Sequence, residues 1–362
     1  MNNFISFIHF TMLIFFLFNL PSSAQSENVE SFLKGKVITD IKNDGVDIWV
    51  ATEGNGIYKF SKSKNKWYNF SSENKIIKQD FFYCLEINKQ FVWAGSADGL
   101  YIYDKRRNSW SKRKFGLGGQ FGNWIRALQF DRYDNSLWIG RFKYLTKYDL
   151  KTKKYDDIDL TIGKNDKANS VKTIAIDGDS LLWVGVEAGL HKIIKNLRDS
   201  NGNEKIVYFD SKESYFMGES DQVSISKILP DKNFIWFGTD EFVTSENPEF
   251  NVGGLFRFDR KINWVKFSEY NKLNANGIFS LEETGNYIWA SVYKFDPESK
   301  GAIGQGVFLI NKKTLSIKKI ESDIIPETIL SMHFDGNNIW LGTNRGLYKV
   351  ALINDLIPNF SR

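Results

Sequence analysis

The sequence is poor in the residues on which disulfide-bonded proteins and many enzymes depend. Its 362 residues include one cysteine and three histidines. A single cysteine excludes an intramolecular disulfide, and Cys84 lies in the apolar stretch FFYCLEI, which predicts a buried side chain rather than a reactive thiol. The phrase GxSxG, which places a nucleophilic serine on a strand-to-helix turn, is missing. These absences argue against a disulfide scaffold and against serine hydrolase chemistry.

Charged side chains are missing from residues 1–24. That stretch contains the apolar run MLIFFLFNL followed by small residues, which predicts a secretory signal peptide over 1–24, cleaved after Ala24. Its start carries no positive charge, so an uncleaved anchor is the alternative. The run is short for a membrane span, and it contains Asn19 and precedes Pro21. No cysteine follows it, as a lipoprotein signal requires. We therefore expect a periplasmic or secreted protein without stable membrane insertion.

The remaining charge is mixed along the chain. The formal net charge is +5, and lysines and arginines occur mostly as single residues between polar and apolar ones. The strongest basic run, KRKF at 112–115, is too short for a nucleic-acid-binding stripe. The sequence therefore predicts no nucleic-acid partner.

An aromatic phrase is present in repeated copies, and its most regular form is NNIWLGTNRGLYKV at 337–350. Seven copies are marked by tryptophans that lie 44 to 53 residues apart, namely Trp49, Trp93, Trp138, Trp183, Trp236, Trp289 and Trp340. This spacing is at or just above the period of four-stranded propeller blades and outside that of most helical repeats.

Each copy predicts four strands. A short alternating segment such as ILSMHF (329–334) leads through an Asp- and Gly-rich turn into the IWxG strand, then the GLYxY strand, then in most copies an outer strand such as KWYNF (66–70). Alternation of large apolar and polar residues fits sheets stacked around an axis. We predict an all-β, monomeric protein: a single seven-bladed β-propeller of four-stranded antiparallel blades over 25–362.

The last copy lacks an outer strand after GLYKVA (346–351), whereas the segment NVESFL (28–33) precedes the first inner strand. We predict that the N-terminal strand near 28–33 pairs as the outermost strand of the seventh blade. Such a strand closes the ring and protects edges that would otherwise invite association.

The phrase IWxGTxxGLYxYD resembles the two-component regulator propeller repeat, found in the periplasmic sensor regions of bacterial hybrid histidine kinases and in some free-standing exported proteins. The resemblance covers residues 36–350, and the third copy, with RFKYLTKYD, departs most. It implies a propeller that binds a ligand, often a glycan breakdown product in the sensors. Because the sequence ends after the seventh copy, we expect a free-standing propeller with no kinase attached.

Departures from the repeat are where a function is expected, because packing accounts for the regular positions. The fifth and sixth copies carry insertions between their second and third strands, at 240–253 and 292–305, and a long segment at 112–124 leads into the third copy. In a propeller these connections open on one face, and loops on a rigid scaffold commonly carry recognition. The alternative is that the insertions are neutral, since loop length costs little.

The third copy carries the most polar chemistry on that face. Arg141 stands where other copies have Thr or Ser, and an arginine among aromatic rings can stack on a sugar and hold an anionic group. The alternative is that Arg141 pairs with Glu187 of the next blade. The predicted ligand-binding set is Trp124, Arg126, Arg141, Lys143, Tyr144, Glu187, Phe242, Tyr293 and Arg345.

A non-catalytic binding module for a small anionic or glycan ligand, without a cofactor, is the predicted function. A protein-interaction scaffold is the alternative. A metal-dependent lyase resembling streptogramin lyases is a remote one, because His191 replaces the tyrosine of the GLY strand and His333 lies on a different, inner strand. Asp199, Asn201 and Asn203 have the spacing of a calcium loop, but Glu204 stands where that loop needs glycine, so an Asn-Gly turn is the preferred interpretation.

Overall fold

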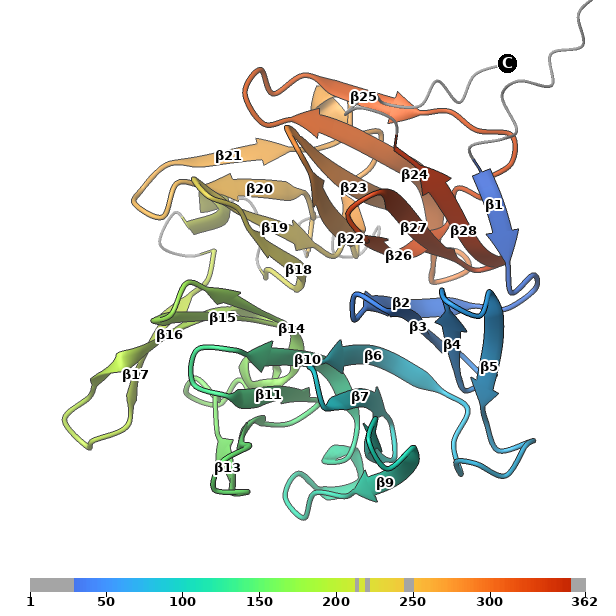
Figure 1. Ribbon diagram of the computed structural model, residues 1–362. Coiled ribbons are helices and arrows are strands. Elements are labelled where there is room, and N and C mark those ends of the chain that lie inside the picture. The colour runs from blue at the N-terminus through green and yellow to red at the C-terminus, as the bar shows by residue number, and fades with distance from the viewer. Residues whose placement is uncertain (1–28, 212–214, 219–221, 244–250, 353–362) are drawn as a thin grey trace, which may run out of the picture.

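The computed structural model describes residues 29–211, 215–218, 222–243 and 251–352. These residues form seven four-stranded sheets arranged as a ring around a central axis, which confirms the predicted seven-bladed β-propeller (Figure 1). The predicted signal peptide over 1–24 lies outside the described residues. In the described part of the chain, no helix has the length and hydrophobicity needed to cross a membrane.

Within each blade the strands are named a to d from the axis outward. Blades one to four consist of β2 (Ile38–Asn43), β3 (Asp47–Thr52), β4 (Ile57–Ser61), β5 (Lys66–Phe70); β6 (Phe82–Ile87), β7 (Phe91–Ser96), β8 (Gly99–Asp104), β9 (Ser109–Arg113); β10 (Ile125–Asp131), β11 (Ser136–Arg141), β12 (Leu145–Asp149), β13 (Tyr155–Ile158); and β14 (Val171–Asp177), β15 (Leu181–Val186), β16 (Gly189–Arg198), β17 (Glu204–Phe209).

Blades five to seven complete the ring. They consist of β18 (Ile225–Pro230), β19 (Ile235–Thr239), β20 (Leu255–Phe258), β21 (Trp264–Phe267); β22 (Gly277–Thr284), β23 (Tyr287–Asp296), β24 (Gly301–Asn311), β25 (Ile317–Ile320); and β26 (Ile329–Phe334), β27 (Asn338–Thr343), β28 (Gly346–Ala351), β1 (Val29–Phe32). Short 3₁₀ turns lie in the connections, at η2 (Gly119–Phe121), η3 (Asp166–Asn169), η4 (Tyr215–Gly218) and η5 (Glu269–Asn271).

Strand β1 is the outer strand of blade seven. It pairs antiparallel with β28, so that Val29 lies opposite Val350 and Phe32 opposite Leu347. This pairing falls within the segment near 28–33 for which it was expected. The first and last described strands of the chain therefore belong to one sheet, and main-chain hydrogen bonds between them close the ring.

Apolar contacts between neighbouring blades form the core. The tryptophan of each copy is at most 2% exposed, and Trp340 of blade seven packs with Ile38 and Ile48 of blade one. The glycine of the IWxG strand has a steric origin: a Cβ on Gly140 would lie 2.5 Å from Cγ1 of Val171 in the next blade. Only a very small residue lets the two blades approach this closely.

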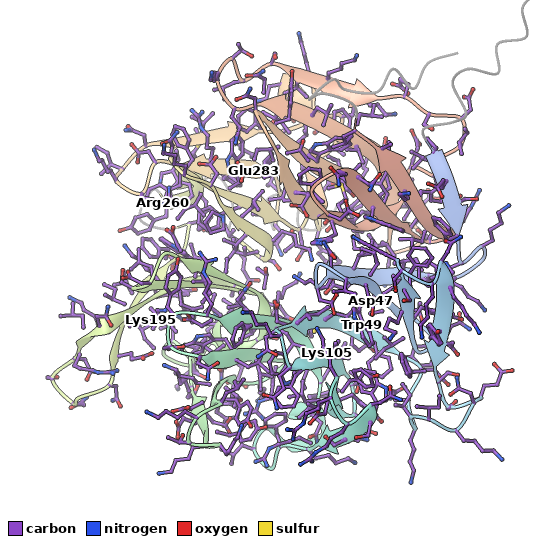
Figure 2. The ribbon with its side chains drawn as sticks, viewed as in Figure 1. Asp47, Trp49, Lys105, Lys195, Arg260 and Glu283 are labelled. Atoms are coloured by element: carbon purple, nitrogen blue, oxygen red, sulfur yellow. The ribbon has the colours of Figure 1, made fainter. Side chains whose placement is uncertain are left out.

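Ion pairs on the face of the a-to-b turns link adjacent blades. A basic residue in the second half of strand c, or just after that strand, contacts an aspartate of the preceding blade, which lies at the end of strand a or just after it. Figure 2 labels three of these basic residues, Lys105, Lys195 and Arg260. The pairs are Lys62–Asp335 at 3.4 Å, Lys105–Asp44 at 2.7 Å, Lys195–Asp131 at 2.5 Å and Arg260–Asp177 at 2.9 Å. Three of these aspartates also accept the indole N–H of their own blade, from Trp49, Trp183 and Trp340.

The pair between blades one and seven makes the stability dependent on pH. Burial alone would raise the pKa of Asp335, but hydrogen bonds from Trp340, Asn338 and Asn337, together with the Lys62 ammonium, lower it to about 2. A carboxylate whose pKa is lowered in the folded state stabilises the protein at pH values above its ordinary pKa of 3.8. This stabilisation is lost as the pH falls from 3.8 toward 2.

As the pH falls from 4 to 2, we therefore expect the free energy of unfolding of Asp335→Asn to decrease less than that of the wild type. After allowance for solvent screening, the difference is about 1 kcal/mol. Urea unfolding at several pH values measures it, with Asp179→Asn on an exposed turn as the control. Parallel pH profiles for wild type and Asp335→Asn would contradict the role of this carboxylate.

Candidate ligand-binding site

The two insertions lie side by side on the face of the b-to-c connections. The fifth-blade insertion brings Phe242 against Phe295 of blade six, with ring centroids 4.5 Å apart. The sixth-blade insertion, residues 292–305, is mostly a β-hairpin and not an irregular loop. It extends β23 and β24, and Tyr293 lies opposite Gly304. Alternation of side chains in VYKF and hydrogen-bonded pairing make a rigid wall here.

A pocket of about 360 Å³ opens where blades four, five and six meet, and we call it the mouth pocket. Its lining joins Glu187 of blade four with Phe242 and Tyr293 from the two insertions, three of the residues predicted from the sequence. The volume is in the range of small-molecule sites. Phe242 is 43% exposed, so its ring is accessible from solvent, whereas Tyr293 is only 6% exposed and belongs to the wall.

A hydrogen-bonded group of charged residues forms the base of the mouth pocket. The Asp240 carboxylate accepts hydrogen bonds from Lys172, Ser224 and the Tyr293 hydroxyl. Burial would raise the pKa of Asp240, but Lys172 and these donors lower it, so this carboxylate is ionised at neutral pH. Glu241 beside it accepts the N–H of Phe295 at 2.8 Å, and burial raises its pKa.

The residues that sequence reasoning missed are Lys172, Ser224 and Asp240. Lys172 occupies a β-bulge, since the register of β14 shifts between Val171 and Thr173. Corresponding bulges occur near the start of every inner strand, at Thr39, Tyr83, Arg126, Lys172, Ser226, Phe279 and Leu330. Bulges re-aim side chains, and a polar residue at the second position of an inner strand is the signal that would have found Lys172.

Arg126 connects the third blade to the mouth pocket. Its guanidinium donates to the Val171 carbonyl at 2.8 Å, to Glu187 Oε1 at 2.7 Å and to Ser170 Oγ at 2.8 Å. The centroid of the Phe142 ring lies 5.0 Å from the Arg126 guanidinium. The Trp124 ring stacks on Phe142, with the two ring centroids 5.3 Å apart. Arg126 therefore orients Glu187 from blade four and has three of its five N–H groups in use.

Arg141 is not placed to contact a ligand. Its side chain is fully buried, and its guanidinium lies 2.6 Å from Asp157 of the outer strand β13. It also donates to the carbonyls of Leu117 and Gly122, so it holds the 112–124 segment against the blade. The acid that pairs with it is Asp157, and the alternative partner considered from the sequence, Glu187, pairs with Arg126 instead.

The other predicted residues are dispersed. Lys143 pairs with the exposed Asp166 at 3.1 Å, and Tyr144 has a positive φ of 77° and lies against the buried Arg141. Arg345 lies in the b-to-c turn of blade seven, outside the lining of the mouth pocket. The mouth pocket thus brings together Glu187, Phe242 and Tyr293. Arg126 and Trp124 lie outside its lining, and Arg126 contacts the pocket through Glu187.

The two histidines that follow the predicted signal peptide are on different strands. His191 of β16 is buried with Nε2 2.8 Å from the Ala168 carbonyl oxygen, and burial lowers its pKa to about 4. His333 of β26 lies with Nδ1 3.8 Å from Glu282 Oε2, and burial, aided by Lys42, lowers its pKa to about 4. Both imidazoles are neutral at physiological pH.

The predicted turn at Asp199 has the geometry of an Asx turn. Asp199 Oδ1 accepts the backbone N–H groups of Asn201 and Asn203 at 2.8 and 2.9 Å. Across the described ranges, no group of three His, Cys, Asp or Glu side chains is placed to share a metal ion. Cys84 is buried, and burial raises the pKa of its thiol.

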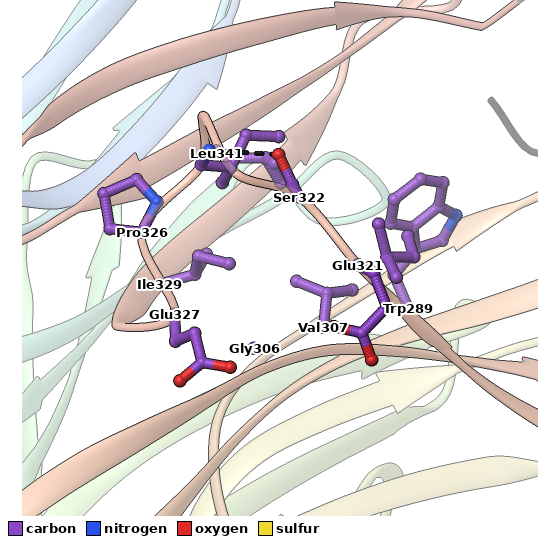
Figure 3. Close-up of a pocket in the computed structure, with 11 residues that line it drawn as sticks. Trp289, Gly306, Val307, Glu321, Ser322, Pro326, Glu327, Ile329 and Leu341 are labelled. Atoms are coloured by element: carbon purple, nitrogen blue, oxygen red, sulfur yellow. Dashed lines mark hydrogen bonds between the residues drawn. The ribbon is translucent and has the colours of Figure 1, made fainter. Parts of the chain in front are cut away.

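A further pocket between blades six and seven is too small to be a candidate ligand-binding site. Figure 3 shows Trp289, Val307, Ile329 and Leu341 around it, and its cavity volume is only about 40 Å³. Ser322 accepts the N–H of Ile325 at its rim, at 3.1 Å. It is a gap in the packing between two blades.

Known proteins share this seven-bladed fold. No family model matches the sequence. Histidine kinase P4 of Formosa agariphila is 29% identical over 176 residues, which are 45% of this chain and 13% of that protein. The extracellular domain of a putative one-component system from B. thetaiotaomicron matches 90% of this chain and 40% of that chain, with 19% identity and a TM-score of 0.66.

These matches confirm the resemblance to the propellers of two-component regulators. Virginiamycin B lyase from Staphylococcus aureus shares the fold as well, with 13% identity, a TM-score of 0.64, and coverage of 90% of this chain and 99% of that one. The chain spans about 13% of the histidine kinase and about 40% of the extracellular domain that it matches. The similarity therefore describes one propeller and not the activity of those larger proteins.

Proposed function

We propose that this protein is an exported, monomeric, non-catalytic binding module that recognises a small glycan in the mouth pocket. The observation that carries the proposal is the exposed ring of Phe242 beside a hydrogen-bonded set of carboxylates and lysines. An aromatic face stacks on the C–H groups of a sugar ring, while fixed carboxylates and ammonium groups bind its hydroxyls.

The charges of the mouth pocket favour a neutral sugar. Its lining carries three lysines and three acids, namely Lys167, Lys172, Lys300, Glu187, Asp240 and Glu241. Because the two signs are balanced and the Asp240 carboxylate is already bound by Lys172, the pocket has no net charge to attract an anion. The sensor relatives agree with a ligand-binding role, and the buried, neutral state of His191 favours a module without lyase activity.

A thermal-shift screen with neutral mono- and oligosaccharides, followed by calorimetry of the hits, tests the proposal. Phe242→Ala should weaken binding about tenfold, since it removes a stacking contact of about 1–1.5 kcal/mol. Phe242→Trp should retain binding. Ile262→Ala, at an 83% exposed position on the c-to-d turn of blade five, serves as the matched control.

The outcomes separate the alternatives. If no saccharide binds, the ligand class is wrong. If saccharides bind Phe242→Ala and wild type equally, the mouth pocket is the wrong site. Arg141→Ala, by contrast, should lower the melting temperature without changing saccharide affinity in the folded protein, because Arg141 supports a loop and does not line the pocket.

A further inference from the structure

The centre of the ring contains a second cavity, which we call the channel. All seven inner strands contribute to its lining, and its volume is about 380 Å³. Its charged lining consists of four basic side chains, from Lys42, Arg126, Lys172 and Lys227, and two carboxyl groups, from Asp40 and Glu282. Which of these charged groups lacks a partner therefore decides what the channel can bind.

Three of the four basic side chains already have a carboxylate partner. Arg126 is bound by Glu187 and Lys172 by Asp240, whereas Lys42 lies 3.8 Å from Glu86 at the wall of the channel.

The Asp40 carboxylate also has hydrogen-bond partners, because it accepts the backbone N–H of Leu85 at 2.7 Å and that of Ile41 at 2.9 Å. It therefore joins β2 to β6. Burial raises the pKa of Glu282 to about 7, so its negative charge is only partly present at neutral pH.

Lys227 on β18 is the exception. Its ammonium group makes no hydrogen bond and no ion pair with any of the described residues, although it lines the channel. Burial lowers its pKa, Asp40 acts in the opposite direction, and the like charges of Lys42 and Lys172 lower it further. A cation that is half-buried among other cations is costly unless water or a counter-ion satisfies it.

We propose that the channel is a binding site for a small oxyanion, held by the ammonium group of Lys227. The channel shares Lys172 with the mouth pocket, but Lys227 lines only the channel and Phe242 only the mouth pocket. An oxyanion of the size of sulfate or phosphate supplies the acceptors that Lys227 lacks and balances the charge of its ammonium group, and the cavity accommodates it with several waters.

Sulfate, inorganic phosphate and acetate, titrated into the purified protein at constant ionic strength in chloride, test this site by calorimetry and thermal shift. We expect saturable binding to wild type, at least tenfold weaker binding to Lys227→Met, and retained binding to Lys227→Arg. Lys313→Met, at an exposed turn, is the matched control. In chloride alone, Lys227→Met should be at least as stable as wild type, because it removes a half-buried, unpaired charge.

The comparison of anions also identifies the class. Stronger binding of sulfate and phosphate assigns the site to divalent oxyanions, and stronger binding of acetate assigns it to carboxylates. Sulfate stabilises proteins in general through exclusion from their surface, so equal stabilisation of wild type and Lys227→Met would overturn the proposal, as would the absence of any saturable signal. Phe242→Ala should bind the anions like wild type, which keeps this test independent of the glycan site.

Discussion

Deletion of residues 29–33 is expected to destabilise the protein by on the order of 5 kcal/mol, since it removes a whole outer strand with its hydrogen bonds and apolar contacts. Strand β1 pairs along its length with β28. The Phe32 ring stacks on Trp340 at 5.8 Å and lies 5.7 Å from Trp67 of blade one, so this strand also joins the two ends of the ring. Urea unfolding and the melting temperature measure the loss.

A point substitution separates the side-chain contribution from that of the strand. Phe32→Ala should cost about 2–3 kcal/mol, less than a fully buried phenylalanine because Phe32 is only half-buried. Ile262→Ala, at an 83% exposed position, should be near neutral. The deletion also leaves the edge of β28 unpaired, so we expect self-association in size-exclusion chromatography. A monomer with unchanged unfolding would show that ring closure does not depend on β1.

The ring could be predicted from sequence because its determinants are local and recur seven times. Tryptophan recurs in all seven copies and the glycine of IWxG in five, with the small residues Ala51 and Ser291 in the other two. Small residues are needed there because of how closely two sheets approach, as the crowding of Gly140 by Val171 illustrates. The interblade ion pairs could not be predicted in this way. Lys195 and Asp131 are 64 positions apart, and each alone resembles a solvated turn residue.

The candidate site was predictable only in part, for related reasons. The insertions indicated the face on which the mouth pocket opens and three of its lining residues, because insertions are visible against a repeat. Arg141 was expected to line the site, but it pairs with Asp157 on the outer strand of its own blade, and this contact is not visible in the repeat pattern. Lys172 and Lys227 were overlooked because whether an inner-strand lysine is paired depends on the neighbouring blades, which a single repeat does not reveal.

Loss of the lysine in the Lys195–Asp131 pair is expected to be the most destabilising point substitution on the a-to-b face. Asp131 has no exposed surface and the Lys195 side chain is only 5% exposed, so Lys195→Met leaves a buried carboxylate without its counter-ion. Removal of one partner of a buried pair costs about 3–5 kcal/mol. The matched control is Lys349→Met, whose pair with Glu30 is solvent-exposed and should contribute less than about 1 kcal/mol.

The double variant Lys195→Met with Asp131→Asn distinguishes an unpaired charge from lost packing. The asparagine carries no charge and can still accept the N–H of Tyr133, which Asp131 Oδ1 accepts at 3.0 Å. If the cost of Lys195→Met comes from the uncompensated carboxylate, the double variant should regain a large part of the free energy of unfolding. An additive loss in the double variant would instead assign the effect to the lysine chain, which packs 5.7 Å from the Tyr133 ring.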